Sequence, residues 1–248
     1  GGCVGDIESL PFLEAVRQIK FDLERNDTLI IHLTLIPYLK SAGELKTKPT
    51  QHSVRMLQEA GIQADILVCR TEHSLSTEIR KKIALFCNVQ INSVIESIDA
   101  DTIYAVPLMM LKERLDQRAL YMLDIYNDKD VDLDSWKQFL SKLQNPVDAV
   151  KIGLVGKYVE LHDAYKSIVE AFIHAGATNE CKVNIEWIHS ESLTPENIGE
   201  KLSGLDGVLV APGFGERGIE GKIAAIQYVR EQGIPFFGIC LGMQMAVI

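Results

Sequence analysis

The stretch Pro235-Phe236-Phe237-Gly238-Ile239-Cys240-Leu241-Gly242 decides the fold of this 248-residue chain. A short apolar run leads into the pattern Gly-x-Cys-x-Gly, and a second apolar stretch follows at residues 243–248. The analogous pattern Gly-x-Ser-x-Gly marks a sharp strand-to-helix turn that exposes a nucleophile at the carboxyl edge of a sheet. Glycines flank the nucleophile because the turn is tight and neighbouring backbone passes close by. We therefore predict that an α/β sheet presents Cys240 as a nucleophile; the alternative is a cysteine buried in the core.

The region upstream of this stretch alternates between strand-like and helix-like patterns. Apolar runs predict strands at residues 150–155, 183–189, 207–211 and 235–239, and helical patterns are present at residues 164–175, 195–202 and 218–231. Because each strand is followed by a helix, right-handed crossovers between them give a doubly wound parallel sheet.

An earlier block of the chain repeats this alternation. Its predicted strands are residues 29–36, 65–69 and 93–97, and its predicted helices are residues 7–25, 51–60 and 77–86. Near-continuous apolar strands between helices predict a parallel sheet that is covered on both faces. The predicted fold class is therefore α/β, with two doubly wound parallel-sheet domains.

A polar stretch separates the two blocks. Residues 124–134 are acidic and polar, a short helix-like piece runs through Trp136, and Asn145-Pro146 interrupts any helix because the residue before proline disfavours helical geometry. We predict a first domain at residues 1–125, a linker at 126–148 and a second domain at 149–248. The alternative is a surface loop inside one domain.

The composition argues against several classes of protein. A net charge of −9 argues against broad non-specific binding of nucleic acid. No apolar run reaches the roughly 18 residues that a membrane-spanning helix needs, so we expect neither nucleic acid nor a membrane as a partner. The five cysteines contain no Cys-x-x-Cys pair, which argues against a zinc site or a disulfide framework. Such cysteine usage predicts a reducing, cytoplasmic compartment.

A second loop supports the interpretation of Cys240. The run Val210-Ala211-Pro212-Gly213-Phe214-Gly215 follows the predicted strand 207–211. A loop at that end of a strand can present backbone N–H groups to a developing oxyanion, and a helix that starts after Cys240 would favour its thiolate. A plain Pro-Gly turn is the alternative. We predict that this loop and Cys240 share one site.

Three other motifs bear on phosphate binding. The run Lys46-Thr47-Lys48-Pro49-Thr50-Gln51 begins a predicted helix, and its lysines, hydroxyls and free N–H groups could hold a polyphosphate, although a solvated basic turn is the alternative. The opening run Gly1-Gly2-Cys3-Val4-Gly5-Asp6-Ile7-Glu8 is a glycine-rich turn with two carboxylates, in which Asp6 could be an N-cap. The run Gly153-Leu-Val-Gly-Lys157-Tyr158 lacks the spacing of a P-loop.

The second half of the chain resembles the class I glutamine amidotransferases. The likeness is carried by Gly238-Ile-Cys-Leu-Gly-Met-Gln244 and the upstream Pro-Gly-Phe-Gly. It implies that Cys240 forms a thioester with glutamine and releases ammonia. It also implies that the N–H groups of Gly213 and Leu241 form the oxyanion hole and that Gln244 contacts the glutamine substrate.

The same family uses a histidine and a glutamate, in a His-Pro-Glu context, well downstream of the cysteine. The chain ends eight residues after Cys240, so we expect the triad to be incomplete in this sequence. His162, His174 and His189 fall in linker-side, helical and strand contexts and are not expected to substitute.

The first half resembles the amidoligase domain of the CTP synthase family, and the likeness runs from end to end of the chain. It is carried by GGCVGDIES and KTKPTQ and continues through residues 82–88, 153–158 and 163–166. The resemblance implies a P-loop-like fold for this half, and Cys3 stands where the family usually has Thr. The implied nucleotide sites comprise Lys46, Thr47, Lys48, Pro49, Thr50, Gln51 and Lys82 for UTP or CTP; Asp6, Ile7 and Glu8 for inhibitory CTP; Ile98, Asp99 and Ala100 for ATP; and Lys166 and Tyr158 for GTP and communication between domains.

The resemblance implies ATP-dependent amination of UTP to CTP, with ammonia from glutamine and with Mg²⁺ accompanying ATP. It further implies CTP as feedback inhibitor, GTP as activator and a homotetramer. The family's P-loop lysine and Mg²⁺ ligands would precede residue 1, so we expect this sequence to be a fragment. An alternative is a catalytically incomplete nucleotide-binding or assembly module. A different cysteine hydrolase would explain Cys240 but not KTKPTQ.

Overall fold

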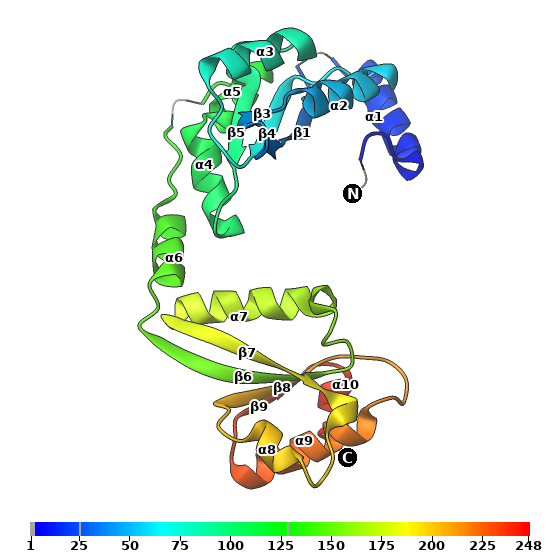
Figure 1. Cartoon of the computed structure of the whole chain (residues 1–248), viewed down its shortest axis with the longest axis vertical. Coiled ribbons are helices and arrows are strands. Elements are labelled where there is room, and N and C mark those ends of the chain that lie inside the picture. The colour runs from blue at the N-terminus through cyan, green and yellow to red at the C-terminus, as the bar shows by residue number, and fades with distance from the viewer. Residues whose placement is uncertain (1–2, 25, 128) are drawn as a thin grey trace. The chain divides into compact units, whose positions relative to one another are not determined.

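The computed structural model describes residues 3–24, 26–127 and 129–248. The chain divides into two compact units, Gly1–Asp132 and Leu133–Ile248 (Figure 1). Each unit contains a sheet of parallel strands, which confirms the predicted α/β fold class. Gly1, Gly2 and Arg25, which the predictions included, lie outside the described residues. The predicted linker bounds, 126–148, remain a prediction.

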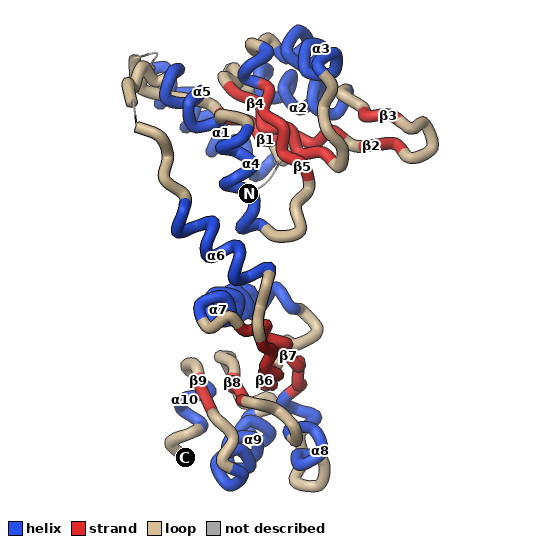
Figure 2. The backbone as a smooth tube through the Cα atoms, turned by 90° about the vertical axis from the view of Figure 1, so that its left-hand side faces the viewer, coloured by secondary structure: helices blue, strands red, loops and turns tan. Residues whose placement is uncertain are grey.

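The first unit is built around a parallel sheet in the order β1-β4-β5. Figure 2 shows these strands in red among the helices of the unit. Its elements are η1 (Ile7–Ser9), α1 (Leu10–Asp22), β1 (Ile31–Ile36), β2 (Tyr38–Leu39), β3 (Glu44–Leu45), α2 (Lys48–Glu59), β4 (Ile66–Thr71), α3 (Thr77–Cys87), η2 (Ile91–Ser93), β5 (Val94–Ile98), η3 (Ile103–Ala105), α4 (Val106–Lys112) and α5 (Leu115–Met122).

The central strand of this sheet, β4, is covered on both faces. Leu67 and Cys69 pack against α2 and α3, whereas Ile66 and Val68 pack against α4 and α5. This alternation follows from the two-residue period of a strand. Each fully buried aliphatic side chain contributes about 1.5–3 kcal/mol, so the apolar run at the centre of the sheet stabilises the unit.

The edge strand β1 is covered on only one face, although the sequence predicted a sheet covered on both faces. His32, Thr34 and Ile36 are buried, but the alternate side chains Ile31 and Leu33 are 46% and 67% exposed. The reason is the strand order: the cluster that α4 and α5 form is centred on β4 and β5 and does not include these β1 side chains.

The predicted helix at residues 7–25 is shorter in the structure. A 3-10 turn occupies Ile7–Ser9, and α1 begins at Leu10 with Pro11 in its first turn. Proline is tolerated there because the first N–H groups of a helix have no partner inside it.

The second unit has a four-stranded parallel sheet in the order β7-β6-β8-β9. Its elements are α6 (Asp134–Gln144), β6 (Asp148–Gly156), η4 (His162–Tyr165), α7 (Lys166–Thr178), β7 (Cys181–His189), η5 (Ser190–Ser192), α8 (Ile198–Leu202), β8 (Gly207–Val210), α9 (Ile219–Gln232), β9 (Phe236–Gly238) and α10 (Leu241–Met245).

Helices lie on both faces of this sheet, as a doubly wound fold requires. In β6, Leu154 belongs to the cluster that packs under α7, and the next residue, Val155, belongs to the cluster under α8 and α9. The figure shows α7 on one side of β6 and β7, with α8 and α9 on the other (Figure 1). The site at the strand ends is thus carried by a rigid, two-sided core.

Two elements of the second unit differ from the predicted pattern. The predicted helix 195–202 begins only at Ile198, because the Asn197 side chain bonds to Thr194 N–H and to the Ser192 carbonyl and closes a turn there. Helix α6 occupies much of the predicted linker. Its Phe139 ring contacts the His174 ring of α7 at a centroid distance of 5.6 Å, so α6 packs as part of the second unit.

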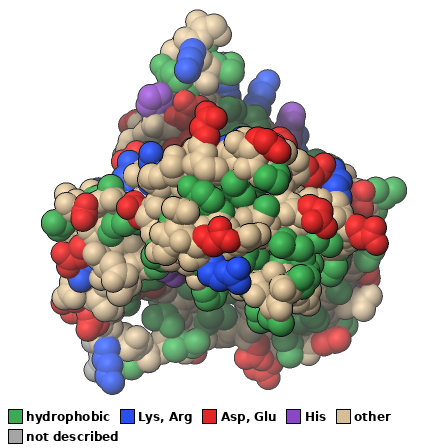
Figure 3. Space-filling view, turned by 90° about the horizontal axis from the view of Figure 1, so that it is seen from below, with side chains coloured by type: hydrophobic (Ala, Val, Ile, Leu, Met, Phe, Trp, Pro, Cys, Tyr) green, Lys and Arg blue, Asp and Glu red, His purple; other side chains and the backbone are tan. Residues whose placement is uncertain are grey.

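The surface carries both signs of charge. On the face drawn in Figure 3, acidic side chains lie scattered among apolar and basic ones, in keeping with the net charge of −9. Within the described residues, no helix has the length and apolar character needed to cross a membrane.

Candidate active site

Cys240 stands at a sharp turn between β9 and α10. The Ile239 N–H still donates to the Val210 carbonyl at 3.1 Å, as in the sheet, and the chain then turns at Cys240 with φ 49° and ψ −107°. A positive φ is uncommon for a residue with a Cβ and persists only where the surroundings impose it. Cys240 is exposed, so the turn presents its thiol to solvent at the carboxyl edge of the sheet.

Two glycines make this turn possible. A Cβ on Gly242 would lie 2.1 Å from the Val210 carbonyl oxygen, and a Cβ on Gly238 would lie 2.6 Å from the Gly242 backbone. Real Cβ atoms do not come this close to backbone, so α10 can pack against β8 and β9 only because both residues lack side chains. The structure thus has the strand, turn and helix that the Gly-x-Cys-x-Gly pattern predicted.

The loop after β8 lies beside this turn. The Ala211 N–H donates to the Val155 carbonyl at 2.9 Å, which anchors the start of the loop to β6. A Cβ built on Gly213 would lie 3.6 Å from Leu241 Cδ2. The residue predicted to complete the oxyanion hole therefore lies next to the residue that follows the nucleophile. Gln244 is exposed on α10, and its N–H donates to the Cys240 carbonyl at 3.0 Å.

Two buried lysines lie behind this loop, and sequence reasoning did not assign them to the site. Lys157 is 2% exposed, and its Nζ donates to the carbonyls of Phe214 and Gly215, both at 2.6 Å. Lys222 is fully buried, and its Nζ donates to the Ala211 carbonyl at 2.6 Å. Burial, and then the charge of Lys157, lowers the pKa of Lys222 to about 8, and interaction with Cys240 opposes this shift. The signal in the sequence was a lysine directly after a buried strand.

The three histidines of the second unit lie in η4, on α7 and at the end of β7. His189 ends β7, and both β6 and β8 lie between β7 and β9. Its Nδ1 accepts from Glu191 N–H at 3.2 Å. His162 stacks on Trp187 at a centroid distance of 4.2 Å, and His174 contacts Phe139. That none of them substitutes for a catalytic base remains a prediction.

The residues predicted for GTP and domain communication follow β6. Tyr158 is partly exposed, and the Arg217 guanidinium lies 5.9 Å from the centre of its ring. Lys166 begins α7 and lies 3.6 Å from Glu170. Between them, the buried Tyr165 hydroxyl accepts from Lys157 N–H at 3.0 Å and closes the loop. These placements do not test the predicted roles.

The KTKPTQ run begins α2, as predicted, but only part of it faces solvent. The Thr50 hydroxyl is buried and donates to the Leu35 carbonyl at 3.0 Å. The Thr47 hydroxyl accepts from Gln51 Nε2 at 3.1 Å, and both side chains are buried. Thr47, Thr50 and Gln51 therefore fix the helix start. Lys48 and Pro49 are exposed and Lys46 is partly exposed.

A short hairpin, which sequence reasoning did not identify, brings Lys46 and Lys82 to one neighbourhood. Strands β2 and β3 pair antiparallel, and Gly43 turns between them with φ 64°. Glu44 on β3 forms an ion pair with Lys46. The hydrogen bond from Lys46, its charge and the charge of Lys82 lower the pKa of the Glu44 carboxyl. Glu44 thus interacts electrostatically with two lysines that were predicted to bind phosphate.

The remaining predicted residues lie in exposed turns. Asp6 takes the N-cap position of η1, but its carboxylate accepts from Cys3 N–H at 2.6 Å and makes no capping bond to the 3-10 turn. Ile7 and Glu8 are exposed in η1. Asp99 and Ala100 are exposed after β5, behind the partly buried Ile98, and Asp99 pairs with Arg70 at 2.7 Å.

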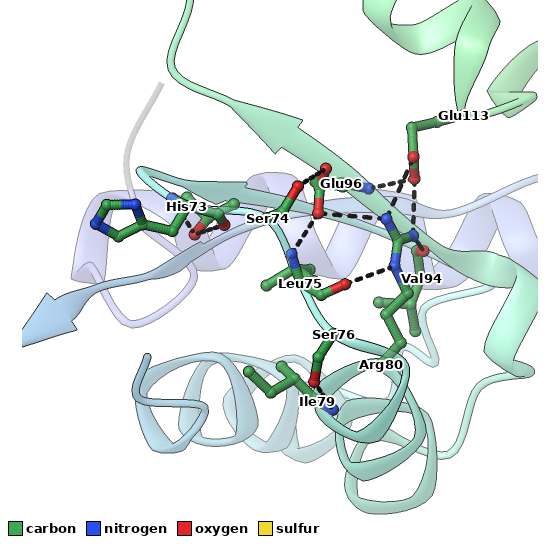
Figure 4. A network of polar contacts seen from close by, with 10 residues as sticks. His73, Ser74, Leu75, Ser76, Ile79, Arg80, Val94, Glu96 and Glu113 are labelled. Atoms are coloured by element: carbon green, nitrogen blue, oxygen red, sulfur yellow. Dashed lines mark hydrogen bonds and ion pairs between the residues drawn. The ribbon is translucent and has the colours of Figure 1, made fainter. Parts of the chain in front are cut away.

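A partly buried ion-pair network ties α3 to the end of α4 (Figure 4). The Arg80 guanidinium donates to both oxygens of Glu113, at 2.7 and 3.2 Å, and to the Val94 carbonyl at 2.9 Å. Glu96 accepts from Leu75 N–H and lies 3.3 Å from Arg80. The network fixes the loop between β4 and α3, and α3 carries Lys82.

Glu113→Gln should destabilise the protein by about 1–2 kcal/mol near neutral pH, a reduced value because the pair is partly exposed. Burial raises the pKa of Glu113, but hydrogen bonds from Arg80 and the Glu96 N–H outweigh it and hold the pKa below its usual 4.5. A lowered carboxyl pKa stabilises the fold above that value, and the gain is lost as the pH falls through the folded-state pKa. Urea unfolding should therefore show the variant and the parent converging at acidic pH. Glu59→Gln, at an exposed position of α2, should change stability by less than about 0.5 kcal/mol. A difference that is constant with pH would contradict the prediction.

Comparison with known proteins covers the whole chain. The family model for the CTP synthase N-terminus matches residues 1–125, and the model for class I glutamine amidotransferases matches residues 160–248. The CTP synthase of Cytophaga hutchinsonii is 69% identical over 248 residues, which is 100% of this chain and 46% of that protein. The CTP synthase of Methanocaldococcus jannaschii is 58% identical over 254 residues, covering 100% of this chain and 47% of that protein.

One solved structure is also similar: the glutaminase domain of Trypanosoma brucei CTP synthase with bound acivicin. It is 42% identical, covers 40% of this chain and 39% of that one, and superposes with a TM-score of 0.38. The chain spans about half the length of the curated relatives it matches. Because the first family model matches half of the chain and joins a glutaminase half, this chain belongs to the CTP synthase family.

Proposed function

We propose that the full-length protein converts UTP to CTP with ATP and glutamine, and that this chain supplies the glutamine-hydrolysing nucleophile and part of the nucleotide site. Family membership supports the overall reaction. One observation carries the assignment of the nucleophile: the strained, exposed Cys240 lies beside a loop whose Gly213 touches Leu241.

In the proposed reaction, the Cys240 sulfur attacks the side-chain amide carbon of glutamine. Negative charge develops on the amide oxygen, where the N–H groups of Gly213 and Leu241 stabilise it. The C–N bond breaks, ammonia leaves, and water then cleaves the thioester to glutamate. The class I glutamine amidotransferase family uses a histidine to move the protons, and we do not assign this role to His162, His174 or His189, whose contacts are with other groups. ATP phosphorylates O4 of UTP, and ammonia displaces the phosphate to give CTP.

The described residues do not fit a resident metal site. Among residues 3–24, 26–127 and 129–248, no group of three His, Cys, Asp or Glu side chains is arranged to hold a metal ion. In this proposal Mg²⁺ arrives with ATP, where it neutralises phosphate charge, and none of the steps assigned to this chain uses it.

The nucleotide half is assigned by the same proposal. Lys46, Lys48 and Lys82 bind the phosphates of UTP or CTP, and the exposure of Lys48 and Lys82 supports this. Inhibitory CTP binds at residues 6–8, ATP at residues 98–100, and activating GTP at Tyr158 and Lys166. A cytoplasmic homotetramer completes the proposal.

Lys82→Ala should weaken UTP binding by about tenfold, because one charge-assisted contact to a phosphate is lost. Lys81→Ala is the matched control, since the neighbouring exposed lysine points elsewhere on the same helix. Calorimetric titration with UTP measures both. Equal losses in the two variants would show that general charge, and not a site at Lys82, attracts the nucleotide.

The overall reaction is tested in a full-length protein. This protein joins the 248 residues of this chain to the flanking regions of the Cytophaga hutchinsonii CTP synthase. With UTP, ATP and glutamine present, this protein should release glutamate and CTP in equal amounts. Glutamate without CTP would contradict the coupled reaction.

For the 248-residue chain by itself, a second function is favoured: nucleotide binding without turnover. The observation that favours it is the placement of His162, His174 and His189 away from Cys240. Calorimetry with CTP and UTP should detect binding, and a glutaminase assay on the same sample should detect no glutamate. Measurable turnover would contradict it.

A further inference from the structure

Lys157 and Lys222 are two buried cations whose neighbours in the structure are mainly backbone. Their exposed fractions are 2% and 0%. Among the described residues, no carboxylate lies within ion-pair distance of either ammonium group. Burying a charge without a counter-charge is costly and is more often found where a site needs it. A function of the two lysines would explain the free-energy cost of burying them.

The contacts of the two lysines converge on one loop. Lys222, in the first turns of α9, holds the Ala211 carbonyl, and Lys157, which follows β6, holds the carbonyls of Phe214 and Gly215. Gly213 lies between these anchored points. A Cβ on Gly213 would lie 3.5 Å from Lys222 Nζ and 3.5 Å from Lys157 Cδ. The lysines therefore contact the loop from both sides of the glycine.

Held carbonyls on both sides of Gly213 restrict how its peptide can turn. The Gly213 N–H shares its peptide with the Pro212 carbonyl, so no lysine holds that peptide directly. The Ala211 carbonyl before it and the Phe214 and Gly215 carbonyls after it are each held by a lysine, which fixes both ends of this short segment. A Cβ on Gly213 would also lie 3.6 Å from Cδ2 of Leu241, the residue after the nucleophile.

We propose that Lys157 and Lys222 are positioning residues that hold the loop at residues 211–215 in the orientation that aims the Gly213 N–H at the oxyanion of glutamine hydrolysis. This inference rests on the proposed function of Cys240 as a glutaminase nucleophile. Neither lysine touches the substrate; each acts through loop carbonyls.

The test uses Lys157→Met and Lys222→Met in the full-length form, because Met keeps the length of the buried chain and removes the donor. Loss of one oxyanion donor lowers kcat by about 10²–10³-fold. We expect kcat for glutamine to fall by about 10²-fold in Lys157→Met, which loses two carbonyl contacts, and by about tenfold in Lys222→Met. KM should change by less than about threefold, since the loop stabilises charge that is present only in the transition state.

The rate of Cys240 alkylation separates a loss of loop positioning from a disruption of the fold around Cys240. Iodoacetamide alkylates Cys240 by forming an S–C bond as iodide leaves, and no oxyanion develops. Its rate should stay within about threefold of the parent in both variants. Lys182→Met, at an exposed position of β7, should leave both rates unchanged.

The outcomes separate this inference from the proposed function. Parent protein that is alkylated at Cys240 but hydrolyses no glutamine would overturn the proposed function, and the inference with it. Parent turnover with kcat nearly unchanged in Lys157→Met would overturn the inference alone. Parallel loss of hydrolysis and alkylation would also overturn it, since the lysines would then support only the fold around Cys240.

Discussion

Cys240→Ala is expected to abolish glutamine-dependent CTP formation in the full-length form while ammonia-dependent formation continues. The thiol is the only group at the turn that can form the thioester, so its loss should lower the glutamine-dependent rate by about 10³-fold or more. External ammonium chloride bypasses that step. Ala fits the turn as well as Cys does, because the change removes only an exposed sulfur and keeps the Cβ at φ 49°.

The measurement compares initial rates of CTP formation with glutamine and with ammonium chloride. Cys181→Ala is the matched control, because it makes the same change in the same unit on β7, away from the turn. It should alter neither rate by more than about twofold. If Cys240→Ala lowered both rates together, the division between a glutaminase site and a nucleotide site would be wrong.

Gly242→Ala is expected to destabilise the second unit by about 3–5 kcal/mol and to abolish glutamine hydrolysis. The new Cβ would lie 2.1 Å from the Val210 carbonyl oxygen, and that carbonyl accepts from Ile239 N–H. Because the new Cβ overlaps backbone atoms of Val210, no side-chain rotation relieves the overlap. Helix α10 must move away from β8, which shifts Cys240 and Leu241 away from Gly213.

Thermal unfolding and the glutaminase assay measure the two effects. Gly199→Ala is the control: its Cβ would meet the Tyr228 ring at an ordinary 3.7 Å inside α8. There alanine should be neutral or stabilising by up to about 1 kcal/mol. A Gly242→Ala protein with parent-like stability and turnover would show that the turn does not need the glycine.

The sequence predicted the sheets better than the ends of their elements. Apolar runs at the centres of both sheets, such as residues 150–155, were found as strands because burial on two faces leaves a continuous pattern. The β2–β3 hairpin was not predicted, since two-residue strands have too few positions to show an alternation. Helix 195–202 was predicted too long because the turn closed by Asn197 depends on side-chain bonds that periodicity does not reveal.

The sequence predicted some residues of the candidate site and missed others. Cys240 was predicted because a tight turn at the nucleophile requires glycines at fixed spacing. Gly213 was assigned by the resemblance to class I glutamine amidotransferases. Lys157 and Lys222 were not, because a lysine in a sequence is normally a surface residue and only the packed structure shows it to be buried. In KTKPTQ, the structure shows that Thr50 and Gln51 fix the start of α2, a role that the pattern alone could not separate from phosphate binding.

Trapping the covalent intermediate tests the central claim most directly. The full-length form is mixed with glutamine, quenched in acid within its first turnover and digested, and the peptide that contains Cys240 is weighed by mass spectrometry. We predict that this peptide carries the added mass of one γ-glutamyl group and that the Cys181 peptide carries none. Glutamate release without any adduct on Cys240, or an adduct on another residue, would contradict the account.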